Sequence, residues 1–316
     1  MRELVLTRTN PMIDPRLHIW GWEIALYLFL GGIVAGMMII SGYFLLKGRH
    51  KEMTCSCLTL PPVAIGLLSI GMLALFFDLE HRWYFWRMYL TFQPASPMSW
   101  GSWILLLVYP ALFANALIRV PASLERWLPI LARWSRAVQV RPGIIAAIGS
   151  ANITLGIALG IYTGILLSAF GARPLWNSAV LGLLFLTSGL SSAAAFVHMI
   201  SRNKDESILL AKADNAFLTL ELVLILLFLI GLVSSTRVHL EAAMLVLTGP
   251  YAPAFWVFVV GLGIVIPLFI QSLAVRHRIA HTPLAPLLVV AGGLALRFVI
   301  VAAGQSSHWT RLILTN

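Results

Sequence analysis

Long apolar runs alternate with short polar connections along the whole chain. Each run can cross a hydrocarbon core of about 30 Å as a helix, because about 20 residues at a rise of 1.5 Å span that distance. The runs are continuously apolar rather than alternating, which favours helices over a β-barrel. The pattern predicts an all-α integral membrane protein with eight transmembrane helices, at residues 20–46, 57–78, 99–119, 143–169, 175–200, 214–234, 252–275 and 284–304.

Composition agrees with this class, since 59% of the residues are hydrophobic, 11% are charged and the mean hydropathy is +0.90. Soluble domains carry about 25% charged residues. The stretch from Met1 to His18 lacks the apolar segment of a cleavable signal peptide, so the first helix is expected to act as its own anchor.

The net charge of +10 is explained by membrane topology and not by nucleic-acid binding, because the basic residues cluster in the connections. The odd-numbered connections hold 13 Lys and Arg, against 8 in the two termini and the even-numbered connections. Basic residues favour the cytoplasmic side. We therefore expect a multi-pass protein of the bacterial inner membrane with both termini in the periplasm.

The eight helices suggest two packed four-helix bundles. We expect a periplasmic N-terminal segment at 1–19, a first bundle at 20–170, a second bundle at 171–305 and a C-terminal tail at 306–316. The longest connection, 119–142, predicts an amphipathic helix at the membrane surface, because apolar residues recur in it at helical spacing: Leu124, Trp127, Leu128, Leu131, Trp134 and Val138.

The chain lacks the residues that tightly bound redox centres need. Among its histidines only His198 lies within a predicted span, whereas a transmembrane bis-histidine haem needs pairs. Cys55 and Cys57 are too few for an iron–sulfur or zinc site and are expected to be reduced thiols. We expect no haem, iron–sulfur cluster or metal in this chain.

Five polar residues fall in the predicted periplasmic half: Glu23, Tyr27, Asp78, Tyr162 and Gln305. A quinone head group needs hydrogen-bond donors for its carbonyls, a group that exchanges protons, and an apolar channel for its tail. We take Glu23, Tyr27, Asp78 and Tyr162 as the candidate quinone site, with His81 from the charged, aromatic loop after Asp78. Each tyrosine alone would also fit an interfacial aromatic belt.

Three further ionisable residues lie at membrane depth, where charges are costly and often functional. Glu221 is in the sixth predicted span with Asp214 before it, and Arg297 is in the middle of the eighth. They form a candidate proton path. A structural ion pair or the substrate site of a secondary transporter would place the same residues there.

Several segments resemble the NrfD/PsrC family, the membrane subunits of polysulfide reductase and of a formate-dependent nitrite reduction system. They run from Trp20-Gly-Trp-Glu23 and Asp78-Leu-Glu-His81 through Ser96-Pro-Met-Ser99-Trp-Gly-Ser to Gly160-Ile-Tyr162-Thr-Gly164 and Arg297-Phe with Ala-Gly304-Gln305. The resemblance covers nearly the whole chain. In the first helix it departs from polysulfide reductase, since Ile24 and Tyr27 stand where that protein has a polar Asn and a His.

The resemblance implies a quinol-oxidising or quinone-reducing membrane anchor of a periplasmic respiratory oxidoreductase, not catalytic alone towards the terminal substrate. Menaquinone, or ubiquinone, would be its exchangeable substrate, and Tyr162 matches the pocket tyrosine of the family. The implied partners are a four-cluster ferredoxin-like iron–sulfur subunit and a molybdopterin or multihaem cytochrome catalytic subunit. A transporter and a passive anchor without a quinone site are the alternatives, and the terminal substrate, the direction of electron flow and proton pumping stay open.

Overall fold

The computed structural model describes residues 20–49, 52, 55–79, 81–121, 126, 129–201, 203–275 and 283–308. Eight helices in this part of the chain are long and apolar enough to cross a membrane, which confirms the predicted number. The spans are α1 (Trp22–Leu46), η1 with α2 (Cys55–Thr59 and Leu60–Asp78), α4 (Pro97–Ile118), α7 (Pro142–Ser168), α8 (Val180–Ile200), α9 (Lys204–Val233), η3 with α11 (Ala254–Val265 and Ile266–Val275) and α12 (Leu284–Gln305).

One span begins well before its apolar run. The sixth, α9, starts at Lys204, ten residues earlier than its hydropathy indicates. The Asn203 side chain accepts a hydrogen bond of 3.0 Å from the Asp205 amide and so caps the helix, and Asp205 and Glu206 in the first turn favour the positive end of the helix dipole. As a result, Glu221 lies near the middle of α9 and Asp214 is fully buried.

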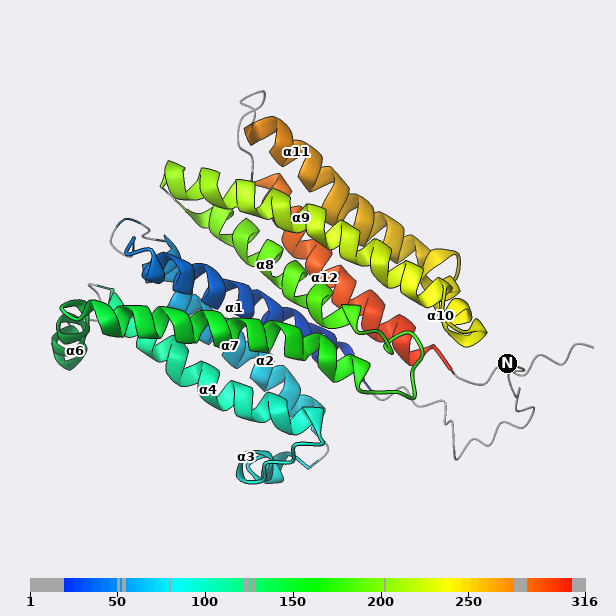
Figure 1. Ribbon diagram of the computed structural model, residues 1–316, viewed down its shortest axis with the longest axis horizontal. Helices are drawn as coiled ribbons and strands as arrows, with labels where there is room; N and C mark the ends of the chain where they lie inside the picture. The colour runs from blue at the N-terminus through cyan, green and yellow to red at the C-terminus, as the bar shows by residue number, and fades with distance from the viewer. Residues whose placement is uncertain are drawn as a thin grey trace, which may run out of the picture.

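Short helices lie at the two ends of the spans (Figure 1). η2 (Arg82–Tyr84), α3 (Arg87–Leu90) and α10 (Arg237–Leu247) lie at one end, and α6 (Pro129–Gln139) lies at the other. The end that carries α3 is called the α3 end below. It is the predicted periplasmic end, a topology that stays a prediction.

α6 falls within the connection where a surface helix is predicted, although Leu124, Trp127 and Leu128 lie outside the described residues. Its Ser135 hydroxyl and Gln139 amide both donate to the Ile118 carbonyl, at 3.2 and 2.7 Å. This carbonyl has no partner within α4, because the last four carbonyls of a helix lack an intrahelical donor. α6 is thereby attached to the end of α4.

The first helix is the centre of the protein. In its most apolar window 89% of the residues are buried, against 33% in the second span, and it packs on α2, α7, α8 and α12 (Figure 1). Small residues make the close approaches possible: a Cβ on Gly36 would come within 2.5 Å of the Gly189 carbonyl oxygen of α8. Close packing of backbones is how helices associate in lipid, where hydrophobic attraction is weak. The division into two bundles and the proposed domain boundaries stay predictions.

Candidate functional site

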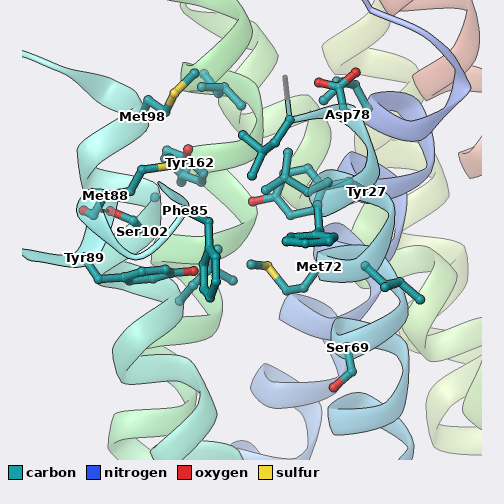
Figure 2. Close-up of a pocket in the computed structure, with 18 of the residues that line it drawn as sticks. Tyr27, Ser69, Met72, Asp78, Phe85, Met88, Tyr89, Met98, Ser102 and Tyr162 are labelled. Atoms are coloured by element: carbon teal, nitrogen blue, oxygen red, sulfur yellow. Dashed lines mark hydrogen bonds between the residues drawn. The ribbon is translucent and has the colours of Figure 1, made fainter. Parts of the chain in front are cut away.

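A cavity of about 370 Å³ lies at the α3 end between α1, α2, α4 and α7. This volume falls within the range of small-molecule sites, about 300–1,000 Å³. Its walls are mostly apolar, with a few polar groups (Figure 2). The lining residues are Trp20, Ile24, Tyr27, Ser69, Met72, Leu73, Leu75, Phe76, Asp78, Leu79, Phe85, Met88, Tyr89, Met98, Gly101, Ser102, Leu105, Tyr162 and Leu166.

Three of the five predicted quinone-site residues meet in this cavity: Tyr27 of α1, Asp78 of α2 and Tyr162 of α7. Figure 2 shows the two tyrosines on facing sides, with Asp78 towards one end and Ser69 towards the other. Both tyrosine rings are buried. Among the described residues, no hydrogen bond engages either phenol or the Asp78 carboxylate, so all three are available to a ligand.

Tyr162 is held in place by a glycine of the opposite wall. A Cβ added to Gly101 of α4 would overlap the ring and the hydroxyl of Tyr162. The phenol therefore rests on the α4 backbone, at a depth that only a residue without a side chain allows. The start of α4 positions Tyr162 for the cavity.

The loop between α2 and α4 closes one side of the cavity through Phe85, Met88 and Tyr89. The Ser102 hydroxyl contacts the Met88 carbonyl at 3.1 Å and the Ser99 carbonyl at 2.8 Å, which links this loop to α4. Burial, and secondarily Tyr109, raises the pKa of the Tyr89 phenol. Tyr89 thus stays protonated and can donate a hydrogen bond into the cavity.

The other two predicted quinone residues lie outside the lining. Glu23 is half-buried and its carboxylate folds back over Gly21 at the start of α1, where the helix dipole favours a negative charge. It still interacts electrostatically with Asp78. His81 precedes η2 and is exposed. The structure therefore gathers Tyr27, Asp78 and Tyr162 and leaves Glu23 and His81 at the rim.

A second polar cluster surrounds Arg297 of α12, which is 1% exposed. One of its terminal nitrogens, Nη2, donates to the Phe185 carbonyl of α8 at 2.8 Å, and the guanidinium lies 4.0 Å from the centre of the Phe185 ring. Gly32 makes room for it, because a Cβ there would lie 3.2 Å from Nη2. The other two nitrogens, Nε and Nη1, have no hydrogen-bond partner among the residues that the structure describes.

The two acidic residues of the predicted proton path are buried in α9 near this arginine. Glu221 interacts electrostatically with Arg297, although no direct ion pair joins them in the described part. Asp214 accepts hydrogen bonds from Ser191 of α8 at 2.6 Å and from Gln271 of α11 at 2.8 Å. The three residues therefore line one buried region between α8, α9, α11 and α12.

The described residues include no group of three or more His, Cys, Asp or Glu side chains that could hold a metal ion. Cys55 and Cys57 are buried and are not joined in a disulfide. The polar groups of the cavity are phenols, hydroxyls and one carboxylate, which suit an organic ligand with carbonyl or hydroxyl groups.

Comparison with known proteins identifies the family. The family model described as "Polysulphide reductase, NrfD" matches residues 10–307. The chain belongs to the NrfD family. It is 31% identical over 310 residues to one of the chains of the polysulfide reductase of Wolinella succinogenes, covering 91% of this chain and 95% of that protein. It is 30% identical over 308 residues to protein NrfD of Escherichia coli, with the same coverage, and 23% identical over 323 residues to one of the subunits of the selenate reductase of Mesobacillus selenatarsenatis, covering 89% and 73%.

Membership of the NrfD family confirms the resemblance seen in the sequence, and together with the eight apolar helices it establishes a multi-pass membrane protein. Sequence reasoning did not select several residues of the NrfD-family cavity. Met98, Gly101 and Ser102 lie in a segment that carried the resemblance, so this segment was a usable signal. Tyr89 stood out only as one aromatic residue of a loop rich in them.

Sequence reasoning also missed Glu206, a fully buried carboxylate at the end of this NrfD-family protein opposite the cavity. It accepts hydrogen bonds from the Cys55 and Ser56 amides, at 3.2 and 2.7 Å, and from the Ser56 and Ser201 hydroxyls, at 2.5 and 3.0 Å. Its place in a charged connection gave no sign of burial. It joins the start of the second span to α9.

Proposed function

We propose that this NrfD-family protein is the quinone-binding membrane subunit of a respiratory oxidoreductase, and that it oxidises quinol, or in reverse reduces quinone, at the cavity of the α3 end. The observation that carries the proposal is the convergence of two unengaged phenols and one unengaged carboxylate in an otherwise apolar cavity. Menaquinol is the proposed substrate, with ubiquinol as the alternative.

The chemistry of the cavity fits the substrate. The Tyr27 and Tyr162 phenols donate hydrogen bonds to the two oxygens of the head group, and Asp78 accepts a proton when quinol is oxidised. Oxidation of one quinol releases two electrons and two protons. Because this chain is proposed to hold no redox centre, the electrons pass to a partner bound at the α3 end.

The proposed partners follow from the family. The relatives include one chain of a polysulfide reductase and one subunit of a selenate reductase, each of which is by its name a single component of a larger enzyme. We propose a four-cluster ferredoxin-like iron–sulfur subunit as the electron acceptor, and a molybdopterin or multihaem cytochrome subunit as the catalytic partner. The α3 end would face the periplasm, in agreement with the distribution of Lys and Arg.

Two exits are open to the protons. Asp78 ends its helix near the membrane surface and can release them locally. An inner path would run from the cavity through Arg297, Glu221 and Asp214 towards the opposite end, with water molecules between the side chains. The buried Nε and Nη1 atoms of Arg297, unpartnered among the described residues, favour water in this region, because buried polar groups are seldom left without partners.

The test is quinol oxidation by the purified complex, with iron–sulfur reduction as the readout. We expect Tyr162→Phe and Asp78→Asn each to slow cluster reduction at least about tenfold, because each removes one group that binds or deprotonates the head group. Native assembly of the complex is checked by gel filtration. A quinol with a pre-ionised hydroxyl would lessen the defect of Asp78→Asn.

Matched controls come from residues of the same type at other places. Tyr43 is exposed at the far end of α1, and Asp205 is exposed at the start of α9. Tyr43→Phe and Asp205→Asn should reduce the clusters at the native rate. Native rates in all four variants would overturn the cavity assignment and favour a passive anchor.

A further inference from the structure

A second hollow continues from the cavity along the outer face of α4. It has a volume of about 420 Å³ and is lined by Phe85, Tyr89, Leu105, Leu106, Tyr109, Pro110 and Phe113. Phe85, Tyr89 and Leu105 line both spaces. The cavity and this hollow, called the α4 groove below, therefore share a wall and adjoin each other.

The α4 groove is almost wholly apolar and faces outwards. Leu106 and Phe113 on its surface are 46% and 58% exposed, whereas Leu105, at the boundary with the cavity, is 4% exposed. In a transmembrane helix such an exposed apolar face meets the hydrocarbon tails of lipids. The groove thus leads from a buried site to the lipid.

The local chemistry of α4 accounts for the groove. Pro110 has no amide hydrogen and cannot donate to the Leu106 carbonyl, and its ring crowds that carbonyl, which opens the helix surface at this turn. On the facing side, the Ser69 hydroxyl of α2 lies 3.3 Å from the Tyr109 hydroxyl of α4. Since Ser69 lines the cavity and Tyr109 lines the groove, this contact joins α2 to α4 where the two spaces adjoin.

We propose that the α4 groove binds the prenyl tail of the same quinol whose head group occupies the cavity. The tail leaves between the aromatic pair Phe85 and Tyr89 and the side chain of Leu105, and then runs along Leu106, Pro110 and Phe113 into the lipid. The inference rests on the proposed function and adds the class of substrate, a quinol with a long isoprenoid chain. Continuity with the cavity distinguishes this occupant from an ordinary phospholipid chain.

Two neighbouring leucines of α4 provide the test. Leu106 lines the groove and is 46% exposed; Leu107 lines neither space and is 55% exposed. Each is changed to Trp in the full chain in nanodiscs. Binding is measured for menadiol, which has no prenyl tail, and for a naphthoquinol with a full prenyl tail, after subtraction of the amount bound by empty nanodiscs.

We expect Leu106→Trp to weaken binding of the prenylated quinol about tenfold, because the indole fills the groove and removes apolar contact with the tail. Menadiol should bind the variant as it binds the unaltered protein, and Leu107→Trp should change neither ligand. Unchanged binding of the prenylated quinol to Leu106→Trp would overturn the inference and leave the groove to a phospholipid chain. Equal loss of both ligands would also overturn it, since the head site would then be disturbed.

The same measurement separates this inference from the proposed function. If neither quinol binds the unaltered protein, the proposed quinone site fails and the tail site fails with it. If both quinols bind the unaltered protein and Leu106→Trp is without effect, the head site stands and only the tail site is lost.

Discussion

The ring of Tyr162 in α7 rests on the Cα of Gly101 in α4, at a place where a methyl group would overlap its hydroxyl. A phenol from one helix and a backbone from another thereby set one wall of the cavity. The proposed head-group contact of Tyr162 depends on this glycine as much as on the tyrosine itself.

Gly101→Ala should therefore displace Tyr162 and lower quinol-dependent iron–sulfur reduction by about tenfold, since small misplacements of binding groups cost about that much in rate. Gly66 in α2 is the control, because a Cβ there meets nothing within 4 Å. Both changes favour helix formation equally. A native rate in Gly101→Ala would show that the Tyr162 position is not needed for quinol oxidation.

The inner proton path predicts a separation of proton movement from electron transfer. Glu221→Gln and Asp214→Asn, in the complex reconstituted into liposomes, should abolish proton translocation while quinol oxidation continues, because neither residue lines the cavity. A pH-sensitive dye inside the liposomes reports the protons. If proton release per quinol is unchanged in both variants, the protons leave at the α3 end and the buried acids have a structural role.

Arg297 and Glu221 should be energetically coupled. Arg297→Met alone leaves a buried carboxylate without its nearby positive charge, whereas Arg297→Met with Glu221→Gln removes both charges. We expect a coupling free energy of about 1–3 kcal/mol in a double-mutant cycle followed by unfolding in detergent. The exposed pair Arg237 and Glu241, 3.6 Å apart, is the comparison and should couple by less than about 0.5 kcal/mol. Coupling of the same size in both pairs would refute a buried interaction.

Glu206 is expected to stabilise the protein without taking part in its chemistry. Glu206→Ala leaves the Cys55 and Ser56 amides without their acceptor and should lower the free energy of unfolding by about 1–3 kcal/mol. Quinol binding should persist, since Glu206 lies at the end opposite the cavity. Glu52→Ala, at an exposed side chain, should leave the melting temperature unchanged. An unaltered melting temperature in Glu206→Ala would disprove the stabilising role.

Hydropathy alone was enough to predict the eight spans, because the cost of leaving backbone groups unpaired in lipid forces long apolar segments to be helices. It failed at the start of α9, where Lys204, Asp205 and Glu206 are polar. That helix begins with a side-chain cap and a favourable charge distribution, neither of which adds to hydropathy.

The sequence by itself determined the membrane class, the number of helices and the family, and it drew attention to Tyr27, Asp78 and Tyr162. Only the tertiary structure decided that these three face one cavity while Glu23 folds back on its own helix and His81 is exposed. Helical spacing gives the face of a residue on its own helix, but not the rotation of that helix against its neighbours. Here close packing at residues such as Gly36 and Gly101 sets this rotation, and it depends on contacts between segments far apart in the chain.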